Sequence, residues 1–149
     1  HITADNVNVA TQAANVFIRT GSGDDAVQVT SGNNVIDAST GSNFLVGGSG
    51  HDIFFVDTTG GQTLWDSISN FHAGDALTIW GFTTGASSYS WADGLGAAGY
   101  TGLTLQISPD GGGMTAQATL VGLSSADRAD LLVQTGVVDG NSYLSITYR

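Results

Sequence analysis

Residues 20–55 divide into four consecutive segments of nine residues, TGSGDDAVQ, VTSGNNVID, ASTGSNFLV and GGSGHDIFF. Three of the nine positions repeat from segment to segment. The fourth is always glycine, the sixth is always Asp or Asn, and the eighth is always apolar. These columns are Gly23, Gly32, Gly41 and Gly50; Asp25, Asn34, Asn43 and Asp52; and Val27, Ile36, Leu45 and Phe54. A fixed short period of this kind is typical of a repeat architecture.

The period predicts a flattened parallel β-roll. Each segment supplies a tight turn of about six residues and a strand of about three, and two segments complete one coil. Residues 18 apart therefore stack, which places Asp25 over Asn43 and Asn34 over Asp52. The eighth-place side chains then form two apolar ladders that face inward. A weaker version of the pattern, without the glycine, extends back through residues 15–18 and 6–9.

The stacked turns are rich in oxygen. Glycine allows backbone shapes that point carbonyl groups inward, and the sixth-place side chains add carboxylate and amide oxygens. Calcium takes about six to eight oxygen ligands in flexible geometry, whereas zinc prefers His or Cys, and His51 stands alone in this segment. The pattern therefore predicts calcium. The alternative is a metal-free β-solenoid that uses Gly-Asn and Gly-Asp only to form turns.

The charge of the chain narrows the choice of partners. All 13 acidic residues are Asp, there is no Lys, and the formal net charge is −10 over 149 residues. Without a basic patch to neutralise phosphates, we expect no nucleic-acid partner and no binding to anionic membranes. No apolar run approaches the roughly 18 residues needed to span a membrane. The chain has no cysteine, so disulfides and thiolate metal sites are excluded.

The nonapeptide pattern resembles the G-G-x-G-x-D-x-U-x repeat of RTX (repeats-in-toxin) or hemolysin-type calcium-binding proteins. Residues 47–55 fit it fully, and residues 20–28 lack only the first glycine. The two middle segments have Asn at the sixth place and lack the first two glycines. Residues 64–82, LWDSISNFHAGDALTIWGF, look like the D-x-I-x-x-F-x-x-G-D-x-I segment that closes the β-roll in secreted RTX enzymes.

The resemblance implies calcium ligands at matching positions. Asp or Asn would contribute side chains, and the other residues would contribute backbone carbonyls. Asp66 matches an aspartate that helps to bind a last ion in the family. The first site would comprise Gly21, Gly23, Asp25, Ala38, Thr40 and Asn43, and the second Thr30, Gly32, Asn34, Gly47, Ser49 and Asp52.

Residues 83–149 carry a different pattern, and we expect them to pack as a β-rich C-terminal region on the roll of residues 1–82. Strands are expected at 101–108 and 114–123, joined by a hairpin at 109–113, and at 142–149. Residues 124–133 favour a short helix with a Ser N-cap. The fold class is therefore all-β, a parallel β-roll followed by a mostly antiparallel region with at most one short helix.

This second half is also similar to the C-terminal segments of proteins exported by type I (ABC-transporter) secretion. The resemblance implies an accessory domain of a larger secreted protein, which folds in extracellular calcium and has the secretion apparatus as a partner. We expect no enzymatic activity from the chain itself. A Walker motif is impossible without Lys, and no nucleophile elbow is present. His72 with Asp75 suits acid–base chemistry, but a histidine in an exposed turn is the simpler interpretation.

Tyr89, Trp91 and Tyr100 lie in a stretch rich in Gly, Ala and Ser, residues 87–100, which is expected to be a loop. Planar aromatics on a neutral loop are how carbohydrate-binding modules stack sugar rings. The alternative function is therefore a calcium-dependent carbohydrate-binding module of a polysaccharide-acting enzyme. Packing of Trp91 in the core is the competing interpretation of the same residue.

Overall fold

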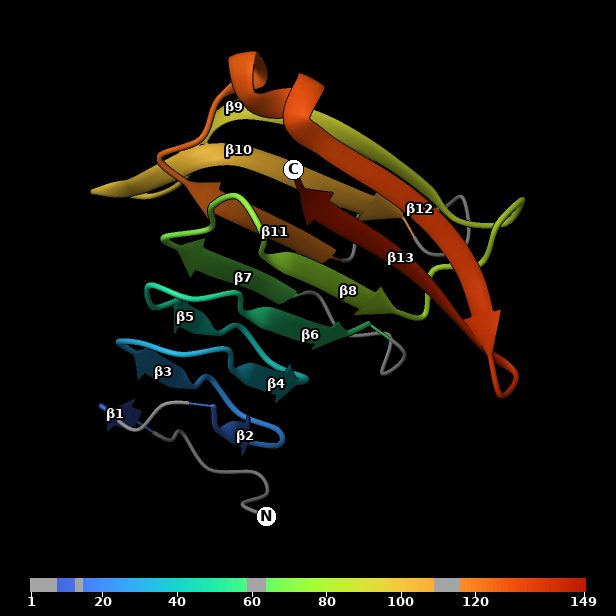
Figure 1. The fold of residues 1–149 in the computed structure, drawn as a ribbon. Helices are drawn as coiled ribbons and strands as arrows, with labels where there is room; N and C mark the ends of the chain where they lie inside the picture. The colour runs from blue at the N-terminus through green and yellow to red at the C-terminus, as the bar shows by residue number, and fades with distance from the viewer. Residues whose placement is uncertain (1–7, 13–14, 59–63, 109–115) are drawn as a thin grey trace.

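The computed structural model describes residues 8–12, 15–58, 64–108 and 116–149, and these form two β-sheets (Figure 1). The seven-stranded sheet has the order β1-β3-β5-β7-β11-β10-β9 and the six-stranded sheet the order β12-β13-β8-β6-β4-β2. The strands are β1 (Asn8–Thr11), β2 (Phe17–Arg19), β3 (Ala26–Val29), β4 (Val35–Ser39), β5 (Phe44–Val46), β6 (Ile53–Asp57), β7 (Leu64–Ser69), β8 (Ala76–Trp80), β9 (Ser88–Ala97), β10 (Tyr100–Ser108), β11 (Ala116–Val121), β12 (Leu131–Val138) and β13 (Asn141–Tyr148). The predicted all-β class is confirmed.

The strands of the nonapeptide region pair in parallel and alternate between the two sheets. In one sheet Val27 lies opposite Leu45, and in the other Ile36 lies opposite Phe54. Both pairs are 18 residues apart, so two segments make one coil, as the period predicts. These four eighth-place side chains are at most 1% exposed and form the core between the sheets.

The fourth-place glycines allow successive turns to lie in contact. A Cβ atom added at Gly50 would lie 2.1 Å from the carbonyl oxygen of Gly32, and one added at Gly41 would lie 1.8 Å from that of Gly23. These distances are far below van der Waals contact. The stacking of the coils, rather than turn conformation alone, therefore requires glycine at these positions.

The spacing between coils changes from 18 to 23 residues at the end of the repeat region. Phe44 of β5 lies opposite Ser67 of β7, and Ile53 of β6 lies opposite Ala76 of β8. Both sheets then continue into the C-terminal half. β11 joins β7 in parallel, whereas β10, β9, β13 and β12 are added by antiparallel pairing. The hairpin predicted at residues 109–113 lies outside the described residues.

For the C-terminal half, the expected loop was wrong, and the expected short helix with its Ser N-cap was confirmed over a shorter range. The predicted loop at 87–100 is mostly strand β9, because it pairs with β10 and places Trp91 opposite the buried Leu105. The predicted helix at 124–133 is a 3₁₀ helix limited to Ser125–Asp130, which Ser124 and Asp127 begin with a capping box. The residues that follow form β12, because β13 offers them a full antiparallel partner.

Candidate metal centre

The turns lie along two edges of the roll. Turns that lead from the six-stranded to the seven-stranded sheet carry Asp25 and Asn43, and Asp66 follows at the start of β7. We call this the Asp66 edge. The return turns carry Asn34, Asp52 and Asp75 and form the Asp52 edge. The two predicted calcium sites therefore lie on different edges, and each predicted set is brought together on its own edge.

Along both edges, the sixth-place side chain accepts a hydrogen bond from the backbone N–H of the sixth-place residue one coil earlier. The predicted stacking of Asp25 over Asn43 and of Asn34 over Asp52 is confirmed. These bonds run from Asp25 N to Asn43 Oδ1 (3.0 Å), from Asn43 N to Asp66 Oδ1 (2.8 Å), from Asn34 N to Asp52 Oδ1 (3.1 Å) and from Asp52 N to Asp75 Oδ1 (2.8 Å).

Asp75 is a member of the Asp52 column that sequence reasoning missed. Its carboxylate is fully buried. It accepts a hydrogen bond from the backbone N–H of Asp52, just as the carboxylate of Asp52 accepts one from the backbone N–H of Asn34. Asp75 follows Asp66 by nine residues, the same interval that separates neighbouring sixth places. That interval was the available signal, and it was hidden because five residues enter the chain before Asp66.

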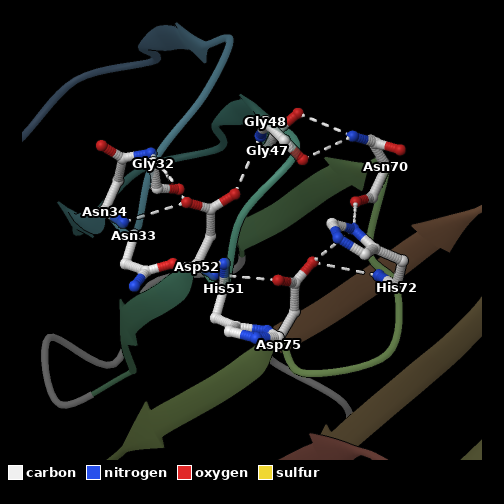
Figure 2. A network of polar contacts seen from close by, with 10 residues as sticks. All are labelled: Gly32, Asn33, Asn34, Gly47, Gly48, His51, Asp52, Asn70, His72 and Asp75. Carbon is white, nitrogen blue, oxygen red and sulfur yellow. Dashed lines mark hydrogen bonds and ion pairs between the residues drawn. The ribbon is translucent and has the colours of Figure 1, made fainter. Parts of the chain in front are cut away.

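Both oxygens of the Asp52 carboxylate accept hydrogen bonds (Figure 2). Its Oδ1 accepts from the backbone N–H and from Nδ2 of Asn34, at 3.1 and 2.8 Å, and its Oδ2 accepts from the N–H of Gly48 at 2.8 Å. The same Nδ2 of Asn34 donates to the carbonyls of Ser31 and Gly32, at 3.1 and 3.2 Å. An amide nitrogen therefore lies among three oxygens where the sequence predicts calcium.

His72 and Asp75 form a contact that closes the last turn of this edge. The backbone N–H and the Nδ1 atom of His72 both lie 3.0 Å from Asp75 Oδ2, and Nδ1 lies 2.9 Å from the carbonyl oxygen of Asn70 (Figure 2). The Asn70 carbonyl raises the pKa of His72, and the Asp75 carboxylate adds to this effect. Burial raises the pKa of Asp75. All these contacts lie within the turn, so the pair stabilises its conformation.

The carboxylate of Asp66 has fewer hydrogen-bond partners than that of Asp52. Its side chain is fully buried and Oδ1 accepts from Asn43, but Oδ2 has no hydrogen-bond partner among the described residues. Burial raises the pKa of Asp66 to about 7. The Nδ2 atom of Asn43 donates to the carbonyl of Gly41 at 3.3 Å, a longer bond than those of Asn34. A buried carboxylate oxygen without a donor can accept a cation, and calcium prefers oxygen ligands.

Of the eight carbonyl ligands implied by the resemblance, seven lie in the turns, and Ala38 lies near the end of strand β4. Gly21, Gly23, Ala38 and Thr40 belong to the Asp66 edge, and Thr30, Gly32, Gly47 and Ser49 to the Asp52 edge. Some carbonyls already accept hydrogen bonds, including that of Gly47 from Asn70 Nδ2 at 2.9 Å. Within the described ranges, no three His, Cys, Asp or Glu residues gather closely enough to hold a metal by side chains alone.

Comparison with protein families agrees with this geometry. Residues 19–54 match the RTX calcium-binding nonapeptide repeat in four copies. The chain carries an RTX-type calcium-binding β-roll. The repeats of this family bind calcium. No curated protein matched the chain. In the part of the RTX chain that the structure describes, no helix is long and apolar enough to cross a membrane.

The three aromatic candidates for sugar stacking do not form one surface. Tyr89 and Trp91 line a pocket with Arg128, Leu131 and Val133, and the Arg128 guanidinium lies 5.8 Å from the centre of the Trp91 ring. Trp91 also packs against the hydrophobic core. Tyr100 packs edge-on against Phe44, with ring centres 4.8 Å apart, and does not line this pocket.

Proposed function

We propose that this chain is a calcium-dependent accessory domain that folds in extracellular calcium and supports the type I secretion and stability of a larger secreted protein. The observation that supports it best is the buried Asp66 carboxylate, whose Oδ2 has no hydrogen-bond donor among the described residues. An ionised carboxylate in this position is costly unless a cation joins it. Calcium bound there would supply that charge and accept the turn carbonyls as further ligands.

Calcium binding and folding are coupled in such a domain. An ion that binds only the folded state raises the free energy of unfolding. This increase grows with the logarithm of the ratio between the ion concentration and its dissociation constant. Extracellular calcium modules work with dissociation constants of about 10⁻⁴–10⁻³ M, far above the calcium level of a cytosol. The net charge of −10 also opposes compaction until cations bind. Weak calcium binding and charge repulsion therefore favour a chain that is loosely folded before export and becomes ordered in extracellular calcium.

We propose further that the chain is not itself an enzyme. His72 and Asp75, the pair that suits acid–base chemistry, contact each other within one turn, and Asp75 is fully buried. A buried carboxylate that already accepts from two backbone N–H groups is poorly placed to exchange protons with a substrate.

Calcium titration of chelator-stripped protein tests the main proposal. We expect heat of binding and a higher melting temperature in millimolar calcium. Asp66→Asn should weaken or abolish both, because it keeps an oxygen for the Asn43 N–H but removes the charge. Asp37→Asn is the charge-matched control, because it changes a partly buried carboxylate on strand β4 that is paired with Arg19 at 3.3 Å. No heat and no shift in melting temperature for the wild type would contradict the proposal.

A second candidate function is binding of a polysaccharide, and the pocket shared by Tyr89 and Trp91 favours it. A neutral sugar ring is the fitting ligand, since the chain is strongly acidic. We expect a neutral polysaccharide to change Trp fluorescence in the wild type but not in Tyr89→Ala, with Tyr100→Ala as the control outside the pocket. Unchanged fluorescence with every polysaccharide tested, with and without calcium, would exclude this function.

A further inference from the structure

The two edges of the roll satisfy their turn carbonyls in different ways. On the Asp52 edge, side-chain amides of Asn34 and Asn70 donate to the carbonyls of two successive turns. Asn34 reaches Ser31 and Gly32. Asn70 reaches Gly47 and Gly48 at 2.9 and 3.0 Å (Figure 2). On the Asp66 edge, the side chain of Asn43 reaches the carbonyl of Gly41 and also contacts the Asp66 carboxylate, but Asp66 Oδ2 has no donor in the described structure.

The orientation of the Asn34 amide is fixed by its surroundings. Its Oδ1 accepts the backbone N–H of Val16 at 3.0 Å, and a nitrogen in that place would set donor against donor. Nδ2 must therefore face Ser31 O, Gly32 O and Asp52 Oδ1, all of which can only accept. For Asn70, Nδ2 faces two carbonyl oxygens, which again requires the nitrogen. Its positive φ of 63° is a conformation that Asn tolerates better than most residues.

An amide nitrogen in this position excludes a calcium ion. The Asn34 nitrogen lies 2.8–3.2 Å from three oxygens, and calcium bound to the same oxygens at about 2.3–2.6 Å would overlap with it. The two N–H groups also supply the positive partner that the oxygens would otherwise find in the metal. Every carboxylate oxygen of Asp52 and Asp75 on this edge already has a donor.

We infer that the Asp52 edge of the roll is closed by the side-chain amides of Asn34 and Asn70 and needs no calcium, so that calcium binding is confined to the Asp66 edge. The second half of this inference rests on the proposed function, whereas the first half stands on the hydrogen bonds alone. Each edge carries two Asp and one Asn in its column, and the Asp52 edge differs by also having Asn70, whose amide donates to the carbonyls of the next turn.

Substitutions at position 34 test the inference. Asn34→Ala should lower the melting temperature by roughly 4–8 °C in chelator and by the same amount in millimolar calcium, because the amide acts without metal. Asn34→Asp should lower it further in chelator, since a second carboxylate would face Asp52 and two carbonyls. Calcium should reverse that loss, and calorimetric titration should count one more ion per chain than in the wild type.

Asn33→Asp is the matched control. Asn33 is exposed and its Oδ1 accepts the N–H of His51 at 2.9 Å, a contact that a carboxylate can also make, as Asp24 does with Ser42. This variant adds the same charge beside the same turn. We expect its melting temperature to change by no more than about 2 °C and the number of bound ions to stay the same.

Two results would overturn the inference: an Asn34→Ala loss that appears only in calcium, or an Asn34→Asp variant that behaves like Asn33→Asp. If Asn34→Asp is unfolded in chelator, recovery of the β circular dichroism signal on adding calcium supports the inference, and Asn34→Ala decides it independently. A wild type that binds no calcium would contradict the proposed function but would leave the chelator comparison of Asn34→Ala intact.

Discussion

Gly50→Ala is expected to cost at least about 3 kcal/mol of unfolding free energy, one of the two largest single-residue effects predicted for this chain. The added methyl would lie 2.1 Å from the carbonyl oxygen and 2.5 Å from the carbonyl carbon of Gly32. Both are backbone atoms, so no side chain can move aside to make room. The coils must separate at this turn, which lengthens the hydrogen bond between Asn34 and Asp52.

Equilibrium unfolding in guanidinium chloride measures this loss. Gly85→Ala is the control, because a Cβ there meets no atom within 4 Å although the backbone φ is +91°. It should lose only the cost of the left-handed conformation, about 1–2 kcal/mol. If the two variants lose the same free energy, the turns are not in the tight contact described for Gly32 and Gly50.

Asp66 should make the metal-free domain less stable as the pH rises. Its pKa increases from 3.8 to about 7 on folding, because burial disfavours the charged form. The folded state is therefore favoured fully below pH 4, and this advantage is lost as the pH rises to about 7. The difference of about three pKa units corresponds to about 4 kcal/mol.

The measurement is the unfolding free energy in chelator from pH 4 to pH 8, for the wild type and Asp66→Asn. Other carboxylates titrate in both proteins, so the difference between the two curves isolates Asp66. We expect Asp66→Asn to be the more stable protein at pH 8 without calcium and to gain little from calcium. The wild type should gain stability from calcium most strongly above pH 7, because the ion needs the deprotonated carboxylate. Parallel curves would show that Asp66 is not the buried charge described here.

The repeat columns predicted most of the roll because each column has one physical role. The apolar eighth place gave the core ladder of Val27 and Leu45, and the sixth place gave the stacking of Asp25 on Asn43. Both follow from an 18-residue coil. The prediction failed where the period changed, and Asp75 was missed for that reason although its column continues.

The chemistry of the Asp52 edge could not be predicted in this way. Asn34 has the right kind of oxygen for calcium, and only its hydrogen bond from Val16 shows that this oxygen is already used. That bond joins residues 18 apart, so it depends on the coil register and not on the local motif. Strand β9 was missed for a similar reason, since its Gly-rich sequence is held by pairing with β10.

The strand order also determines how order spreads through the molecule. Each parallel coil bonds only to its neighbours, so the roll behaves as a one-dimensional stack in which structure propagates from any coil already formed. The hairpins β9–β10 and β12–β13 have short connections and close with little loss of chain entropy. The first hairpin is joined to β7 through β11, and the second hairpin pairs with β8 through β13. Together they offer a folding nucleus from which both sheets can be extended. Under the proposed function, we expect removal of calcium to disorder the parallel coils first, while the antiparallel end stays folded and provides the template on which they form again.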